Sequence, residues 1–157
     1  MEKQQEFMRE AIRLSIENVQ SGNGGPFGAV IVKEGKIIGR GKNEVTNSSD
    51  PTAHAEIVAI REACKNLNSF QLEGCEIYCS CEPCPMCLGA IYWARPSKIF
   101  YANTKEDAAS INFDDEFIYA ELELSKGKRK LPTIQLLRDE ALIAFNLWDS
   151  SAGKVVY

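Results

Sequence analysis

The sequence contains a single histidine, no long hydrophobic run and no excess of basic residues. Apolar stretches such as residues 90–94 fall far short of the roughly 18 residues that a membrane helix needs, so we expect no membrane partner. The 18 Lys and Arg residues are outnumbered by 22 Asp and Glu residues, which leaves a net charge of −4. A protein that binds a phosphate backbone usually has a basic excess, so we do not expect nucleic acid as a partner.

The amino terminus, residues 1–6, is polar and of mixed charge, and it does not resemble a signal segment. We therefore expect a cytoplasmic protein, in which the six cysteines are not paired as disulfides. Four of these cysteines crowd into residues 79–87, which favours metal or redox chemistry. A length of 157 residues with 45% hydrophobic residues predicts one globular domain, residues 1–157, because this is enough apolar material for a core.

Hydrophobic periodicity predicts helices that alternate with strands. The expected helices span residues 5–20, 53–67, 85–94, 115–124 and 139–148. The expected strands span residues 27–32, 36–45, 75–81, 97–102 and 133–137, and the first two form a hairpin across a turn at Glu34 and Gly35. Residues 46–52 are expected to form a polar loop. This order predicts a layered α/β domain with a mixed sheet.

Two short motifs carry candidate chemistry: His54-Ala55-Glu56 and Pro83-Cys84-Pro85-Met86-Cys87. Both stand at predicted helix starts, and the two cysteines share a helix face because they are three residues apart. One histidine and two cysteines leave the fourth position of a tetrahedral site open for water, as in catalytic zinc sites. A carboxylate at Glu56 can then take a proton from such a water.

A closed zinc knuckle is the competing interpretation of the same cysteines. It would use Cys79, Cys81, Cys84 and Cys87. That arrangement leaves the histidine and Glu56 without a role, and it implies a small fold built around zinc. We therefore interpret Cys79 and Cys81 as packing residues or as residues that support the metal ligands.

The paired motifs resemble the H-x-E and P-C-x-x-C signature of the zinc-dependent nucleobase deaminases. The resemblance spans roughly residues 1–120 and implies the three-layer α/β/α domain of the cytidine deaminase type, with a central mixed sheet. Small bacterial guanine deaminases are the most similar group. The segments that carry this likeness are residues 24–30, 50–56, 84–96 and 113–119, together with Tyr157.

The resemblance implies hydrolysis of guanine, a purine base, to xanthine and ammonia with one Zn²⁺ per subunit. His54, Cys84 and Cys87 would hold the metal, and Glu56 would move the proton.

The same resemblance implies a set of base contacts. Asn43 would donate to O6 or N7 of the base, and Asp115 would accept from the 2-amino group and help it leave as ammonia. The sequence alone does not choose between Asp115 and Asp114 for this role. The competing interpretation of the pair is a helix N-cap, and each residue can serve one of the two roles. Further contacts would come from Phe27 and Trp93 beside the ring, from the backbone N–H of Ala55, and from Tyr157.

The likeness thins over the tail, residues 125–157, which begins with the basic segment 125–130. In the guanine deaminase group this segment crosses to a second subunit, which implies a homodimer with Tyr157 over the partner's pocket. A frayed terminus is the simpler alternative. Two other functions stay open at this point: a deaminase of the wobble adenosine in tRNA, and a non-catalytic zinc-binding module that would tolerate Glu56→Ala.

Overall fold

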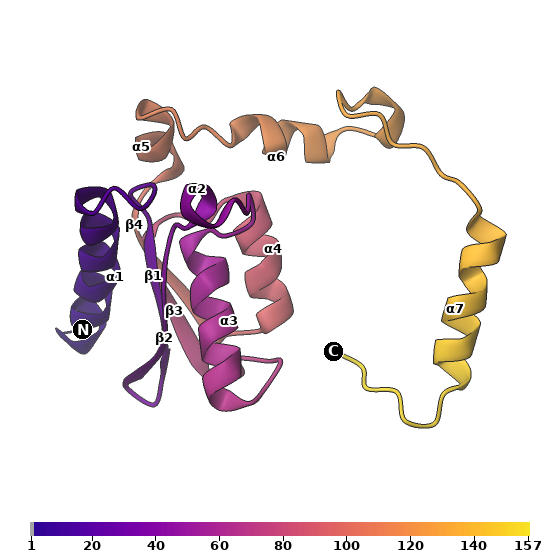
Figure 1. The fold of residues 1–157 in the computed structure, drawn as a ribbon, viewed down its shortest axis with the longest axis horizontal. Coiled ribbons are helices and arrows are strands. Elements are labelled where there is room, and N and C mark those ends of the chain that lie inside the picture. Colours follow the sequence, from indigo (N-terminus) through magenta and orange to yellow (C-terminus); the bar gives the residue numbers. More distant parts are fainter. Residues whose placement is uncertain (1) are drawn as a thin grey trace. The chain divides into compact units, whose positions relative to one another are not determined.

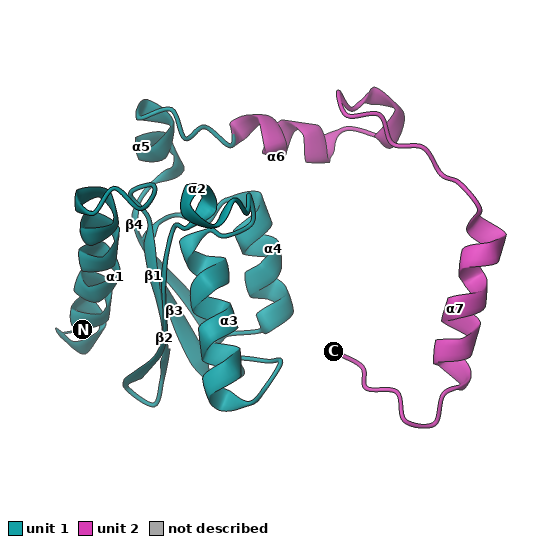
Figure 2. Cartoon of the chain, in the orientation of Figure 1, with its two compact units in different colours: residues 1–115 teal, residues 116–157 magenta. Residues whose placement is uncertain are grey.

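The computed structural model describes residues 2–157, which divide into two compact units: residues up to Asp115 and residues 116–157 (Figure 2). The first unit contains α1 (Glu2–Gln20), β1 (Gly28–Lys33), β2 (Lys36–Lys42), α2 (Val45–Ser48), α3 (Ala55–Leu67), β3 (Cys75–Cys81), α4 (Pro85–Ala94), β4 (Lys98–Asn103) and α5 (Lys105–Ser110). The second contains α6 (Glu116–Glu123), a 3₁₀ turn (Lys126–Lys128) and α7 (Arg138–Ser150).

The first unit is built on a four-stranded mixed sheet with the strand order β2-β1-β3-β4. Strand β1 runs antiparallel to both of its neighbours, whereas β3 and β4 run parallel. The parallel pair is connected through α4, as a crossover requires. This arrangement confirms the predicted mixed sheet.

Helices cover both faces of the sheet, and the alternation of side chains along β1 shows why (Figure 1). Val30 and Val32 belong to a cluster with Leu14 of α1, whereas Ala29 and Ile31 pack into the cluster formed with α3 and α4. Successive strand residues point to opposite faces, so one strand supplies two cores. The first unit therefore has the predicted three layers of helix, sheet and helix.

Two glycines of β2 allow α3 to approach the sheet very closely. A Cβ atom at Gly41 would lie 2.0 Å from the backbone oxygen of Ala55, and one at Gly39 would lie 2.5 Å from the backbone oxygen of Ala59. Real Cβ atoms do not approach other atoms so closely. The amino-terminal end of α3 therefore rests directly on the β2 backbone, and this contact fixes the position of the residues that begin the helix.

The structure corrects three details of the predicted elements. Residues 133–137 are not a strand; no strand pairs with them among the residues described, and Leu137 adopts a left-handed conformation before α7. A β-prone sequence needs a ladder partner to form a strand. The polar loop at residues 46–52 includes the short helix α2, and α5 was missed although Thr104 and Asp107 form a capping box at its start.

The second unit consists of short elements that bury no residue. Neither α6 nor α7 has a buried side chain, and large apolar residues such as Phe145 and Trp148 are exposed. No helix in residues 2–157 has the length and apolar character that crossing a membrane requires.

Candidate active site

The site is assembled from the starts of two helices on the same side of the sheet. His54 is the N-cap residue of α3, and Cys84 is the N-cap residue of α4. Pro85 then occupies the first position of α4, where its fixed φ suits the helix and no N–H is needed. Cys87 follows within the same first turn. Helix N-termini carry partial positive charge and favour thiolates, so both helices prepare this point for anionic ligands.

A tight turn leads the chain into His54. The carboxylate of Asp50 accepts hydrogen bonds from the backbone N–H of Thr52 at 2.8 Å and from its hydroxyl at 2.7 Å. These hydrogen bonds are the main cause of the lowered pKa of Asp50, and Arg61, at 3.6 Å, adds to it. The turn therefore fixes the backbone immediately before the histidine.

The three predicted metal ligands meet at one point. The Nδ1 atom of His54 lies 3.5 Å from the sulfur of Cys84 and 3.5 Å from the sulfur of Cys87. All three ligand atoms lie within 4.8 Å of one another. Tetrahedral zinc with its usual Zn–N and Zn–S bond lengths sets these atoms about 3.5 Å apart. The donor set and its spacing therefore fit zinc, with one position left for water.

The electrostatics of the cluster favour a thiolate at Cys84. The thiol of Cys87 donates a hydrogen bond to this sulfur, and with His54 nearby the pKa of Cys84 falls to about 4. The same hydrogen bond, together with burial, raises the pKa of Cys87. Contact with the Cys84 sulfur raises the pKa of His54. One ligand is thus already anionic at neutral pH, as metal binding requires.

Glu56 is the buried acid of the site. It lies in the first turn of α3, and only 8% of its surface is exposed. Removal from water raises its pKa, and the charge on Cys84 acts in the same direction. A carboxylate with a raised pKa both accepts and returns a proton more easily near neutral pH. The local structure therefore suits a proton carrier better than a structural ion pair.

A pocket of about 400 Å³ opens beside this cluster, and all of its lining residues belong to the first unit. Among the predicted residues, it is lined by Phe27, Asn43, His54, Glu56, Cys84, Asp114 and Asp115. The ring of Phe27 meets Phe113 edge to face with the ring centroids 4.9 Å apart, which gives the pocket an aromatic wall. This size lies within the range of about 300–1,000 Å³ found for small-molecule sites.

Polar groups in the pocket are arranged for hydrogen bonding. Asn43 is buried, and its Oδ1 atom accepts a bond from the backbone N–H of Val45 at 3.4 Å. In this orientation the amide nitrogen of Asn43 keeps its two N–H donors for another partner. Burial raises the pKa of Asp115, with the charge of Cys84 as a second cause. The pocket lining thus contains both amide donors, from Asn43, and carboxylate acceptors, from Asp114 and Asp115.

Not every predicted residue lies in this pocket. Ala55 is buried at the start of α3, beside the two pocket residues His54 and Glu56. Trp93 lies on α4 with 65% of its surface exposed and does not line the pocket, and Tyr157 belongs to the second unit.

Other residues of the lining were not predicted to contact the base: Gly25, Val45, Thr46, Cys81, Glu82, Lys105, Ala108, Asn112 and Phe113. Only the capping box before Lys105 offered a sequence signal for this region.

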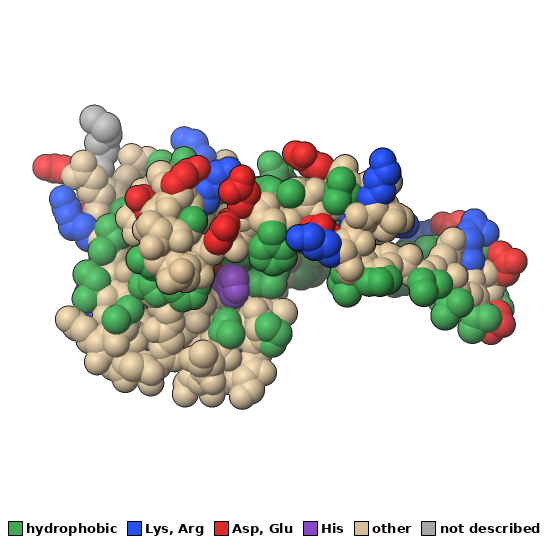
Figure 3. Space-filling view, turned by 90° about the horizontal axis from the view of Figure 1, so that it is seen from above, with side chains coloured by type: hydrophobic (Ala, Val, Ile, Leu, Met, Phe, Trp, Pro, Cys, Tyr) green, Lys and Arg blue, Asp and Glu red, His purple; other side chains and the backbone are tan. Residues whose placement is uncertain are grey.

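The site is reached from the surface. His54 is half-buried, and because it is the only histidine of the sequence, the purple atoms in Figure 3 mark it at the surface. A small molecule can therefore reach the cluster without unfolding of the first unit.

Comparison with known proteins identifies the motifs. A family model described as the cytidine and deoxycytidylate deaminase zinc-binding region matches residues 1–103. This range contains the histidine, the acid and both cysteines of the cluster, and it covers most of the first unit.

Two relatives resemble the chain over nearly its whole length, and a third resembles it over about two thirds of that length. The guanine deaminase of Bacillus subtilis is 54% identical over 151 residues, which is 96% of this chain and 97% of that protein. The X-ray structure of that enzyme has a TM-score of 0.95 and matches over 98% of both chains. A tRNA-specific adenosine deaminase of Haemophilus influenzae is 34% identical over 96% of this chain and 94% of its own. Guanine deaminase from Nitrosomonas europaea has a TM-score of 0.66 at 32% identity, over 69% of this chain and 63% of that one.

Proposed function

Because the chain belongs to the cytidine and deoxycytidylate deaminase family, we propose that it is a zinc-dependent guanine deaminase that hydrolyses guanine to xanthine and ammonia. The observation that carries the proposal is the 54% identity to a guanine deaminase across nearly the whole chain, pocket and tail included. The tRNA-specific relative of similar coverage is only 34% identical. The acidic net charge also suits a small base better than a polyanion.

We assign the metal to His54, Cys84 and Cys87, whose ligand atoms have the spacing that zinc needs. Bound zinc supplies a water whose pKa is near 7. Glu56 accepts a proton from the attacking water and returns it to the base, while a C–O bond forms at C2 of guanine. When the C2–N bond breaks, the amino group leaves as ammonia with the second proton of the water.

The base is recognised by groups on the pocket wall. Guanine offers N1–H and a 2-amino group as donors and O6 and N7 as acceptors. Asn43 uses its free amide donors on O6 or N7, and Asp115 accepts from the 2-amino group and assists its departure. Phe27 flanks the ring, and the N–H of Ala55 is a further donor at the start of α3. The role of Trp93 stays a prediction, because this side chain lies outside the pocket lining.

The protein acts as a homodimer in the cytosol, in which residues 125–157 are exchanged and Tyr157 covers the pocket of the second subunit. Two observations support this proposal. All six cysteines are free thiols, as in a reducing compartment. Neither α6 nor α7 buries a side chain, and apolar surface of this kind marks an interface.

Ammonia release from purified, zinc-loaded protein tests the reaction. Guanine, guanosine, adenine, cytosine and a tRNA anticodon stem-loop are compared side by side, with Glu56→Ala as the inactive control. We expect release from guanine alone. Release only from the stem-loop would overturn the substrate and keep the zinc chemistry, and full function of Glu56→Ala would indicate a non-catalytic zinc module.

A further inference from the structure

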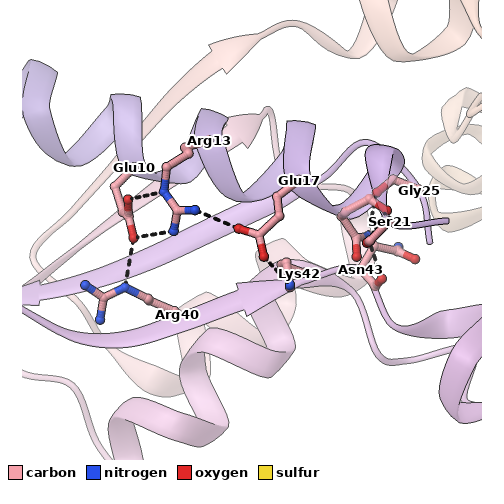
Figure 4. A network of polar contacts seen from close by, with 9 residues as sticks. Glu10, Arg13, Glu17, Ser21, Gly25, Arg40, Lys42 and Asn43 are labelled. Atoms are coloured by element: carbon pink, nitrogen blue, oxygen red, sulfur yellow. Dashed lines mark hydrogen bonds and ion pairs between the residues drawn. The ribbon is translucent and has the colours of Figure 1, made fainter. Parts of the chain in front are cut away.

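Asn18 of α1 is a buried amide that touches two walls of the pocket without lining it. Only 1% of its surface is exposed. Its Nδ2 atom donates to the backbone oxygen of Gly25 at 2.9 Å and to the backbone oxygen of Asn43 at 2.8 Å. Figure 4 shows Gly25 and Asn43 side by side at the end of α1. One side chain thus connects a helix, the loop before β1 and the residue after β2.

The same three segments are also packed without spare room. A Cβ atom at Gly24 would lie 2.2 Å from the backbone oxygen of Asn43 and 3.0 Å from Nδ2 of Asn18. The backbone N–H of Asn43 donates to the backbone oxygen of Phe27 at 3.2 Å. Gly25, Phe27 and Asn43 all line the pocket. The position of these three wall residues therefore depends on one closed set of hydrogen bonds.

At this position the protein uses the hydrogen-bond donors of Asn18 and not its acceptor. Its two donated bonds satisfy two carbonyl groups, whereas its Oδ1 atom accepts no hydrogen bond from the described residues. An apolar side chain of the same size would leave both carbonyls without this partner, and buried unpaired groups cost free energy. The two carbonyls would then shift toward new partners and carry the pocket wall with them.

We propose that Asn18 is a positioning residue for purine selectivity: it holds the Asn43 backbone and the Gly25–Phe27 loop so that the Asn43 amide faces the base. The inference rests on the proposed role of Asn43. The buried cluster of Leu14 with Val30 and Val32 holds α1 on the sheet independently of Asn18. The ion pairs Glu10–Arg40 and Glu17–Lys42 add to this contact (Figure 4). Loss of the buried amide therefore alters the pocket wall while α1 stays in place.

The experiment compares Asn18→Leu with Ser15→Ala, a matched control on the same helix. Ser15 is also buried, but its hydroxyl donates to the backbone oxygen of Ile12 in the same helix, and neither residue lines the pocket. For each variant, kcat and KM are measured on guanine, on 2,6-diaminopurine, which replaces the O6 acceptor, and on 7-deazaguanine, which lacks N7. For each analogue, the value of kcat/KM on guanine is divided by the value on that analogue. The ratio that changes in Asn43→Ala is the one that reports on the Asn43 amide.

We expect Asn18→Leu to lower this ratio of kcat/KM values about tenfold, because one hydrogen bond to the base is misplaced. The zinc content should not change. Ser15→Ala should leave the ratio at the wild-type value. Asn18→Ser, which keeps one donor, should fall between them and serves if the leucine variant does not fold.

Equal losses on all bases in Asn18→Leu, with an altered ratio in Asn43→Ala, would overturn the inference alone. An unchanged ratio in Asn43→Ala would refute the recognition role of Asn43 and the inference with it. Neither result would contradict the proposed guanine deaminase activity, which the ammonia assay tests separately.

Discussion

Gly41→Ala tests whether the close contact between β2 and α3 holds the catalytic helix in place. The added methyl group would lie 2.0 Å from the backbone oxygen of Ala55 and 2.6 Å from the backbone nitrogen of Ala59. Both partners are backbone atoms, so no side chain can rotate away. The start of α3 must therefore retreat by about 1 Å, and overpacking of this kind costs about 1–3 kcal/mol of folding free energy.

The functional effect follows from the same displacement, because His54 and Glu56 begin this helix. A misplacement of about 1 Å can lower turnover about 100-fold. Urea unfolding gives the stability, and guanine turnover with zinc content gives the function. The control is Gly89→Ala on α4, where the new methyl group meets nothing within 4 Å and should stabilise by about 0.5–1 kcal/mol. Wild-type stability and turnover in Gly41→Ala would refute the reasoning.

Three further predictions concern single acids. Glu56→Gln should keep zinc but lower kcat by about 10²–10⁴-fold, measured on the zinc-loaded protein, because the buried proton carrier is lost. Asp115→Ala should lower guanine turnover more than Asp114→Ala in the same assay; the reverse order would exchange their roles. Glu10, whose pKa is lowered to about 2 mainly by its hydrogen bond to Arg13, should stabilise the fold by about 1 kcal/mol or less, since the pair is partly exposed. This stability is present above the unfolded pKa of 4.5 and is lost as pH falls through about 2, so the gap between wild type and Glu10→Gln in urea unfolding should close over that range.

The metal cluster could be predicted from the sequence because its geometry is local. The spacing of Cys84 and Cys87, with proline between them at the first helical position, defines one helix start. His54 and Glu56 define another in the same way. Only the proximity of these two helix starts depends on the tertiary fold. It was predicted from the resemblance to a known signature.

The rest of the pocket could not be predicted from the residues because it depends on packing between distant segments. Asn43 and Asp115 came from the resemblance alone, and Glu82 and Lys105 were missed although both line the pocket. The prediction of a strand at residues 133–137 was wrong for a related reason. β-prone residues form a strand only beside a partner strand, and the local sequence pattern carries no information about that partner.

Glycines and a buried amide explain how the distant segments reach their places. Gly41 brings the start of α3 onto β2, and Gly24 brings the loop before β1 onto the residue that follows β2. Asn18 then connects that loop and Asn43 to α1. None of these three residues has a side chain that reacts, and a motif search passes over them. The reactive groups occupy short motifs, whereas their relative positions are set by small or buried residues elsewhere, so selectivity is expected to respond to substitutions outside the pocket lining.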